Sequence, residues 1–196
     1  GNASTNIITG NVGNNRLLGR GGDDFISGGA GADVLIGGAG TDRAYYYFSD
    51  AAVRVDLSTG KGQGGEAEGD LLSGIEDLSG SVLADRLTGN SGKNRLDGIY
   101  GNDRLTGAGG RDEFVFSSKS GSTNRDTIVD FADGQDRIDL TGWALFDIDT
   151  FAEVKARMTA KHGDVVIDFS AATAANILTI KHAHIADFSA ADFLLG

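Results

Sequence analysis

The stretch Gly19–Asp42 reads GRGGDDFISGGAGADVLIGGAGTD and is built from nine-residue units that begin at Gly19, Gly28 and Gly37. Every unit places an aspartate at its sixth position and an apolar residue at its eighth. These residues are Asp24, Asp33 and Asp42 at position six, and Ile26, Leu35 and Ala44 at position eight. A short, fixed period of glycine, one carboxylate and one apolar residue is typical of a solenoid. The stretch therefore predicts an all-β fold, a parallel β-roll with a narrow apolar core between two sheets.

The same spacing suits a calcium ion held between turns. Glycine at positions one, two and four permits positive φ and lets carbonyl oxygens approach an ion. Ca²⁺ takes about six to eight oxygen ligands, more than one turn supplies, so two turns on the same edge would share each ion. With two units per circuit, same-edge turns lie eighteen residues apart, so Asp24 would face Asp42 and Asp33 would face Asn15.

A second regular block begins at Gly80 with the units GSVLADRLT, GNSGKNRLD, GIYGNDRLT and GAGGRDEFV. Position six holds Asp85, Asn94, Asp103 and Asp112, and position eight holds Leu87, Leu96, Leu105 and Phe114. Same-edge pairing joins Asp85 to Asp103, and Asn94 to Asp112. Residues 46–79 depart from the period, although Gly69, Asp70 and Leu72 keep its spacing. We expect imperfect turns there that bridge the two blocks.

We expect five or more calcium ions, bound by position-six side chains and turn glycines. The predicted metal ligands are Asn15, Gly19, Gly21, Asp24, Gly28, Gly29, Gly31, Asp33, Gly37, Gly38, Gly40, Asp42, Asp70, Asp85, Asn94, Gly101, Asp103, Gly107, Gly110 and Asp112. Without Ca²⁺ the stacked carboxylates repel one another, and the thin core does not offset the entropy lost by ordering the backbone. The apo chain is therefore expected to be largely unfolded.

Composition narrows the function. With 28 Asp and Glu against 17 Lys and Arg, the net charge of −11 disfavours nucleic acid and anionic membranes as partners. The chain has no cysteine, so a metal is a candidate for the stabilisation that disulfides would give. No apolar run is long enough to span a bilayer, and the first residues lack the pattern of a secretory signal peptide. HExxH, GxSxG and phosphate-loop motifs are absent, which predicts a module that is not an enzyme by itself.

The last part of the sequence predicts a cap on the roll. Its aspartates, some of which would complete one more cation site, are Asp126, Asp130, Asp133, Asp136 and Asp139. A capping box at Thr150 and Glu153 opens a predicted helix with Met158 on its apolar face and Gly163 as its C-terminal cap. Two strands are expected after it, at Val165–Phe169 and Ile177–Lys181.

Three groups of side chains have two interpretations each. Tyr45, Tyr46 and Tyr47 either pack against the roll, which we favour, or stack on sugar rings. Arg86, Arg95 and Arg104 recur at position seven, where they either form a solvated face, again favoured, or bind an acidic polysaccharide in a row. His182 and His184 stand two apart, so on a strand they would share one face. They either bind a transition metal or have no ligand role, which we favour because no third ligand is evident in the sequence.

The unit GGAGADVLI matches, residue for residue, the consensus GGxGxDxUx of the repeats-in-toxin (RTX) family, and the match recurs in phase over about residues 1–115. The following segment, DEFVFSSKSGSTNRDTIVDFADGQDRIDL, resembles the part that closes the roll in serralysin-type metalloproteases and in repeat modules of mannuronan C5-epimerases. The final ADFLLG is similar to that family's acidic and apolar ending.

This resemblance implies a secreted, extracellular module that type I ABC machinery exports through an uncleaved C-terminal signal and that folds when it binds Ca²⁺. The implied host is an exported bacterial enzyme or surface protein. The alternative is a module of a mannuronan C5-epimerase-like enzyme that binds alginate. The expected divisions are a first RTX block at 1–45, spacer turns at 46–79, a second block at 80–116, and a cap with the secretion signal at 117–196.

Overall fold

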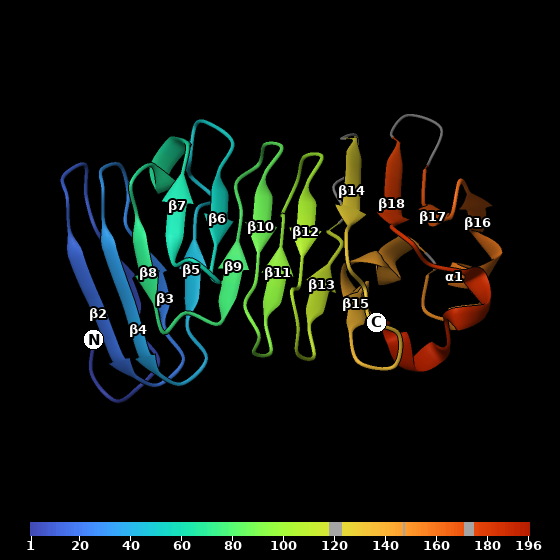
Figure 1. Cartoon of the computed structure of the whole chain (residues 1–196), viewed down its shortest axis with the longest axis horizontal. Coiled ribbons are helices and arrows are strands. Elements are labelled where there is room, and N and C mark those ends of the chain that lie inside the picture. The colour runs from blue at the N-terminus through green and yellow to red at the C-terminus, as the bar shows by residue number, and fades with distance from the viewer. Residues whose placement is uncertain (118–122, 147, 171–174) are drawn as a thin grey trace.

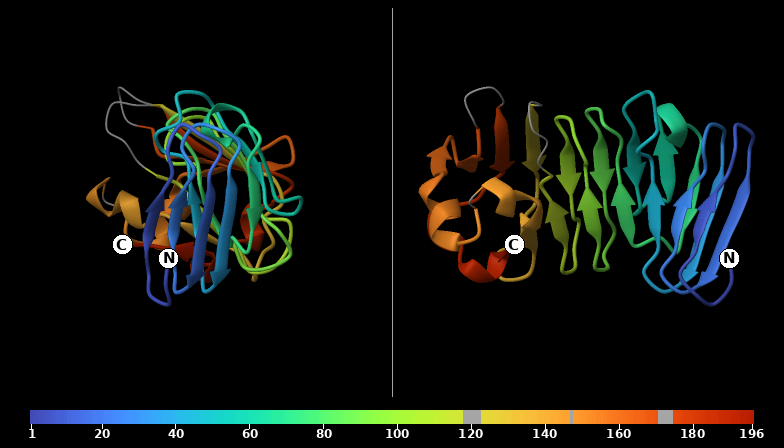
Figure 2. Two further views of the ribbon diagram at one scale, coloured as in Figure 1. Left: turned by 90° about the vertical axis from the view of Figure 1, so that its left-hand side faces the viewer. Right: turned by 180° about the vertical axis from the view of Figure 1, so that it is seen from behind.

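The computed structural model describes residues 1–117, 123–146, 148–170 and 175–196. The chain forms an elongated coil in which short strands alternate between two facing sheets, with the N-terminus at one end and the helical cap at the other (Figure 1). Seen along the coil, the two sheets lie close together with loops at both edges (Figure 2). The predicted parallel β-roll is confirmed.

Over the described residues, sheet A has eight strands and sheet B has eleven. In spatial order, sheet A consists of β1 (Ile7–Thr9), β3 (Phe25–Ser27), β5 (Arg43–Tyr45), β9 (Asp77–Ser79), β11 (Arg95–Asp97), β13 (Glu113–Val115), β15 (Arg137–Asp139) and β19 (Phe193–Leu194). Sheet B consists of β2 (Arg16–Gly21), β4 (Val34–Ala39), β8 (Leu71–Ser73), β7 (Lys61–Gln63), β6 (Arg54–Asp56), β10 (Arg86–Thr88), β12 (Arg104–Thr106), β14 (Asn124–Ile128), β18 (Asn176–Ile180), β17 (Asp164–Asp168) and β16 (Met158–Lys161).

Position-eight residues form the core of the roll. In sheet A, Ile26 lies in register with Ile8 and Ala44, and in sheet B, Leu87 lies in register with Leu105. Each short strand sends one such side chain inward, because side chains alternate between the two faces of a strand. The buried set along the regular units is Ile26, Leu35, Ala44, Leu78, Leu87, Leu96, Leu105 and Phe114. The core is therefore a single apolar layer.

Residues 46–79 join both sheets and connect the two regular blocks. They supply β6 to β9 and a 3₁₀ turn at Gly65–Ala67. β7 runs antiparallel to β6 and β8, whereas β9 pairs in parallel with β5 and β11 on the other face. Hydrogen-bonded strands therefore continue from the first block into the second.

Consecutive nine-residue units lie on opposite sheets, and this corrects the expected row of arginines. Arg86 and Arg104 are neighbours on sheet B, but Arg95 lies on sheet A, where it pairs with Glu113. The reason is that two units make one circuit, so only alternate units share a face. The residue that adjoins Arg86 on its other side is Arg54 of β6.

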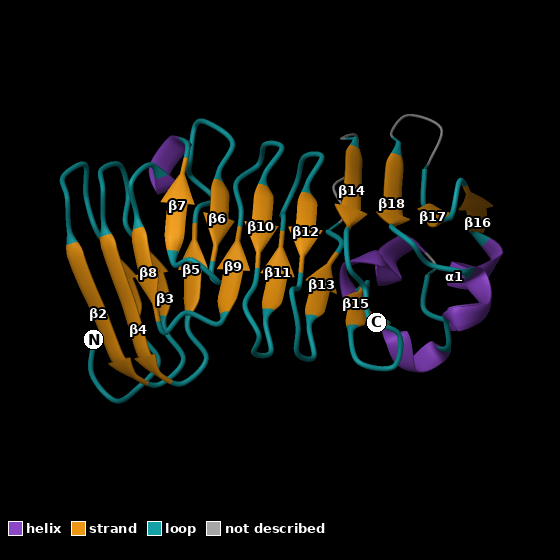
Figure 3. Cartoon of the chain, viewed as in Figure 1, coloured by secondary structure: helices purple, strands orange, loops and turns teal. Residues whose placement is uncertain are grey.

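The cap contains α1 (Phe151–Ala156), the short helical turns Thr141–Phe146, Ile185–Asp187 and Ala190–Asp192, and the β16–β17–β18 strands (Figure 3). The predicted capping box at Thr150 and Glu153 is confirmed. None of the described helices is long and apolar enough to cross a membrane. Trp143, Phe116 and Phe169 form a cluster of three rings in mutual contact beyond the last regular unit. The Trp143 centroid lies 5.4 Å from that of Phe116 and 4.8 Å from that of Phe169, and the two phenylalanine centroids are 5.5 Å apart.

The predicted helix extends too far, and the two histidines His182 and His184 do not lie on a strand. Met158 begins β16, which pairs with β17, so tertiary strand pairing ends the helix at Ala156. Gly163 is in a two-residue hairpin turn with His162, where both residues have positive φ, 84° and 55°. β18 ends at Ile180, so His182 and His184 lie beyond the strand and are not on one strand face.

Candidate metal centre

Position-six side chains form a ladder along each edge of the roll. On one edge, Asp42 Oδ1 accepts a hydrogen bond of 2.9 Å from the backbone N–H of Asp24, and Asp112 Oδ1 accepts one of 2.9 Å from Asn94. On the other edge, Asp103 Oδ1 accepts one of 2.9 Å from Asp85. The further links are Asn6 to Asp24, Asn15 to Asp33, Asp33 to Asp70, Asp42 to Glu76, Asp103 to Asp126, and Asp112 to Asp136. The predicted same-edge pairs are therefore in contact.

Four units have a turn that closes on itself. In the unit that begins at Gly89, Asn94 Oδ1 accepts the N–H of Asn90, and Asn90 Oδ1 accepts the N–H of Gly92. The units at Gly1, Gly10 and Gly80 repeat these bonds through Asn2 and Asn6, Asn11 and Asn15, and Ser81 and Asp85. We call them closed turns, because the side-chain oxygen at position six already accepts a hydrogen bond from the backbone N–H of position two in the same unit.

Five units have a different backbone at position two, and we call them open turns. Their position-two residues all have positive φ: Arg20 at 83°, Gly29 at 83°, Gly38 at 122°, Ile99 at 73° and Ala108 at 74°. For Arg20, Ala108 and above all the β-branched Ile99 this conformation is strained, at a cost of about 1–2 kcal/mol each. A strained backbone at recurrent positions is typical of a functional site.

Open turns leave buried carboxylate oxygens without partners. The Oδ2 atoms of Asp24, Asp33, Asp42 and Asp103 are buried and accept no hydrogen bond. These four residues are 2% exposed or less. An unpaired buried carboxylate oxygen costs more than an unpaired neutral polar atom, and a bound cation offsets that cost. The orphaned atoms belong to open turns and to none of the four closed ones.

The surroundings of these oxygens fit a hard cation. A Cβ added to Gly19 would collide with both Asp24 Oδ2 and the carbonyl oxygen of Gly37, and one added to Gly37 would collide with Asp42 Oδ2 and the carbonyl oxygen of Gly74. Position one must therefore be glycine. A carboxylate oxygen and a carbonyl oxygen from the next coil approach each other there, and Ca²⁺ prefers oxygen ligands of these two kinds. Position one of the closed turns at Gly1, Gly10 and Gly89 is equally crowded by oxygens, so the unpaired Oδ2 atoms, and not this crowding, distinguish the open turns.

Two of the predicted aspartates have their second oxygen occupied. Asp70 Oδ2 accepts a hydrogen bond of 3.0 Å from the hydroxyl of Tyr46, which is buried. Asp85 Oδ2 accepts hydrogen bonds from the backbone and hydroxyl of Ser81. The packing interpretation of the tyrosines is thus confirmed for Tyr46, and neither carboxylate has a free oxygen comparable with that of Asp103.

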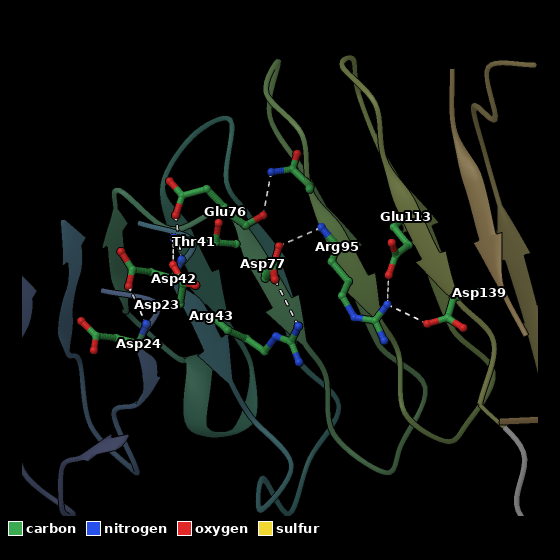
Figure 4. A network of polar contacts seen from close by, with 11 residues as sticks. Asp23, Asp24, Thr41, Asp42, Arg43, Glu76, Asp77, Arg95, Glu113 and Asp139 are labelled. Carbon is green, nitrogen blue, oxygen red and sulfur yellow. Dashed lines mark hydrogen bonds and ion pairs between the residues drawn. The ribbon is translucent and has the colours of Figure 1, made fainter. Parts of the chain in front are cut away.

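Burial and like charge make the ladders electrostatically unfavourable when ionised. Burial raises the pKa of Asp70 to about 6 and that of Asp112 to about 7. Burial, followed by the neighbouring Asp126 carboxylate, raises the pKa of Asp103, and burial together with Asp24 raises that of Asp42. Figure 4 shows Asp24, Asp42 and Glu76 following one another along the edge. Such a stack favours either protonation or a bound cation.

Sequence reasoning missed several residues of these ladders. Glu76 occupies position six when the nine-residue register is extended back from Gly80, and its Oε2 accepts the N–H of Asp42 at 2.9 Å. Gly22, with φ of 87°, is the position-four glycine of its unit. The strain at Ile99 and Ala108 has no sequence signal beyond their place in the repeat.

Within the described ranges no group of three or more histidine, aspartate or glutamate side chains is arranged to bind a metal ion. This is consistent with sites in which one or two carboxylates per ion are supplemented by backbone carbonyls. That the listed aspartates, asparagines and glycines bind calcium in this way remains a prediction.

Comparison with known proteins gives one family and one solved structure. The family model described as peptidase M10 serralysin C terminal matches residues 2–196. The crystal structure of the extracellular lipase LipA from Serratia marcescens is similar, with 17% identity and a TM-score of 0.43, over 98% of this chain and 38% of the lipase chain. The chain thus spans 38% of the length of that lipase. No match was found among curated proteins.

Proposed function

The chain belongs to the serralysin C-terminal family, and on that premise we propose that it is a calcium-binding RTX module that folds on meeting Ca²⁺ outside the cell. The observation that supports calcium binding most is the set of buried Oδ2 atoms without partners at Asp24, Asp33, Asp42 and Asp103. Each belongs to a turn with positive φ at position two. At Asp24 and Asp42 a backbone carbonyl oxygen of the next coil also lies close to the position-one glycine.

We assign the ions to the five open turns, with Asp24, Asp33, Asp42, Asp103 and Asp112 as their carboxylates. Bound Ca²⁺ supplies positive charge between coils whose carboxylates otherwise repel. The chain's own residues do the rest: the position-one glycines admit the oxygens, and the Oδ1 atoms fix the carboxylates on the neighbouring coil. Asn15 and Asn94 lie in closed turns, and their Oδ1 atoms already accept backbone hydrogen bonds, so they are less suited to hold an ion than the repeat pattern predicts.

The energetics make Ca²⁺ a folding switch. Sites of the extracellular class bind with dissociation constants of roughly 10⁻⁴ to 10⁻³ M. Free Ca²⁺ at about ten times that value adds ~1.4 kcal/mol per site, so five sites add about 7 kcal/mol, comparable with the stability of a whole domain. The stabilisation vanishes at the low Ca²⁺ concentration of a cytosol.

This switch suits a protein exported unfolded by type I ABC machinery, with residues 117–196 as cap and secretion signal. The C-terminal domain of serralysins is non-catalytic, and we propose that this chain likewise carries no chemistry of its own. Its host would be a secreted enzyme or surface protein whose identity lies outside the chain.

A far-UV circular dichroism titration tests the proposal. In chelator we expect little β structure, and on adding Ca²⁺ a cooperative gain that equal Mg²⁺ does not produce, because Mg²⁺ demands a smaller octahedral site. Full β structure in chelator would overturn calcium-dependent folding.

A further inference from the structure

Exposed apolar side chains gather in the N-terminal half of the roll. Among the described residues, the exposed large hydrophobic side chains all lie at or before Leu83. At the same outward positions the second half has charged and hydroxyl residues, since β10 and β12 read RLT and β11 reads RLD. Apolar exposure that is confined to one part of a surface is typical of an interaction site.

Three aromatic rings form a cluster on the outer side of sheet A, where β5 ends. Tyr45 and Tyr47 are stacked, with ring centroids 6.0 Å apart and ring planes at 13°. Phe48 meets both rings edge-on, at centroid distances of 6.1 and 5.2 Å. We call these three residues the aromatic cluster. Phe48 is 74% exposed, so the cluster leaves its most apolar ring in water.

The neighbouring strands extend the apolar surface. Ile7 on β1 and Phe25 on β3 lie in register and are 84% and 41% exposed. Phe25 is in register with Arg43 of β5, and Tyr45 follows Arg43 on the same face of that strand. Phe25 and Tyr45 are therefore diagonal neighbours, within reach of each other's rings. We call Ile7, Phe25 and the aromatic cluster together the apolar face of sheet A.

The charge on this face is neutralised within the chain. Arg43 forms an ion pair of 3.1 Å with Asp77 and lies over the Phe25 ring, 5.3 Å from its centroid (Figure 4). The outward residues of β1, β3 and β5 include no carboxylate: Ile7, Thr9, Phe25, Ser27, Arg43 and Tyr45. A second molecule therefore meets no excess of either charge here.

The apolar residues on the outer side of sheet B have a different setting. In one row across that sheet, Val34 and Leu71 lie in register between Arg16 and Lys61. Both cations are exposed, and neither is in an ion pair among the described residues. Two copies would bring like charges together on this side, whereas the apolar face of sheet A has no such barrier.

Sheet A is also complementary in charge to itself. β5 carries Arg43 at position seven and Tyr45 at position nine, and β11 carries Arg95 and Asp97. If two copies pack sheet A on sheet A about a two-fold axis that runs across the strands, position seven of a strand lies opposite position nine of the same strand in its mate. Each cation then meets an aromatic ring or a carboxylate of the other copy.

Arg95 can make such a contact without losing its partners. Its ion pairs with Glu113 and Asp139 both use Nη1. A guanidinium group has five N–H donors on three nitrogens, so donors remain for the Asp97 carboxylate of the mate. A second copy of the chain is therefore an occupant whose charges match this face.

We infer that two copies of the folded chain associate through the apolar face of sheet A, with the aromatic cluster in the contact. The net charge of −11 repels copies elsewhere on the surface, so the neutral face selects one mode of contact. A two-fold contact closes on itself, so the assembly stops at the dimer. Five strands about 4.8 Å apart, β1 to β11, give a small interface, of the size found in weak and transient complexes.

Sedimentation velocity of the full chain in Ca²⁺, over about 1 to 300 μM, tests this association, which goes beyond calcium binding and requires only the folded roll. The variant is Tyr47→Ser with Phe48→Ser. The matched control is Val82→Ser with Leu83→Ser, two adjacent apolar residues outside the apolar face, each 39% exposed. Circular dichroism in Ca²⁺ verifies that every protein is folded.

We expect wild type to form a dimer with a dissociation constant on the order of 10 μM. The cluster variant should weaken association at least tenfold, and the control less than twofold. Folded wild type that stays monomeric at the highest concentration overturns the inference and leaves the face to a different partner. An equal loss in both variants overturns it too, as does growth beyond the dimer. None of these outcomes bears on calcium-dependent folding, which the dichroism measurement reports separately.

Discussion

Asp85 and Asp103 face each other on neighbouring coils of one edge, yet their second carboxylate oxygens have different surroundings. Ser81 donates to Asp85 Oδ2, whereas Asp103 Oδ2 is buried without a partner. The difference follows position two of the unit, where Ser81 closes its turn and Ile99, with φ of 73°, does not. This pair therefore separates a structural carboxylate from a proposed ligand.

Asp103→Asn should raise the Ca²⁺ concentration needed for half-maximal folding and remove about one ion, since it deletes the charge at an open turn. Asp85→Asn should remove no ion, because Ser81 already occupies Asp85 Oδ2; its cost to stability should come from the amide NH₂, which then faces a backbone N–H of Val53 or Ser81. Calorimetric titration of both variants compares them directly. Equal losses of ions would show that open and closed turns do not differ in function.

Ile99 offers a test of strain. Ile99→Gly should stabilise the Ca²⁺-bound roll, or leave it unchanged, because relief of positive φ at a β-branched residue offsets the ~1 kcal/mol of chain entropy that glycine adds. Val82→Gly, at an exposed residue of a closed turn, should destabilise it by about 0.5–1 kcal/mol. Urea unfolding in saturating Ca²⁺ measures both, and a larger loss for Ile99→Gly would argue against strain at this position.

At the level of elements, the two sheets carry charges that act in opposite ways. Arg95 lies between Glu113 and Asp139 on sheet A, while Arg86 lies between two other arginines on sheet B. Arg95→Gln should lower the free energy of unfolding by about 1 kcal/mol, since it leaves two partly buried carboxylates unpaired. Arg86→Gln should change it little or raise it. Denaturant unfolding in Ca²⁺ at low and high salt measures the free energy of unfolding of both variants. A larger loss for Arg86→Gln than for Arg95→Gln would contradict the two charge patterns.

Much of the roll follows from its repeat, and the exceptions have physical causes. The nine-residue period fixes the position-eight core and the same-edge pairs such as Asp24 with Asp42, because each depends only on spacing. The end of α1 cannot be predicted from the repeat, because the pairing of β16 with β17 places Met158 in a strand. The hydrogen bond from Tyr46 to Asp70 connects the irregular segment 46–79 to the ladder of position-six side chains. No local sequence pattern indicates this bond.

For the whole molecule, protons and Ca²⁺ should compete for the same oxygens. Burial raises the pKa of Asp70 to about 6 and of Asp112 to about 7, from an ordinary value of 3.8. The stability they contribute is therefore fully present below about pH 4 and is lost as the pH rises through 6 and 7.

Without Ca²⁺, the chain should accordingly hold more β structure at pH 5.5 than at pH 8, and with Ca²⁺ the midpoint should move to higher concentration on acidification. Dichroism in chelator at several pH values, with monomer content followed by light scattering, measures this. If the β content in chelator increased with pH, repulsion within the carboxylate ladders could not be the source of the apo chain's instability.

The central claim is that cations lie between successive coils, against the carboxylate oxygens of the open turns. The most direct measurement is an anomalous difference map from crystals of the full chain grown with Ca²⁺. The account predicts peaks about 2.3–2.6 Å from the Oδ2 atoms of Asp24, Asp33, Asp42 and Asp103. A well-ordered roll without peaks at these four oxygens would contradict it.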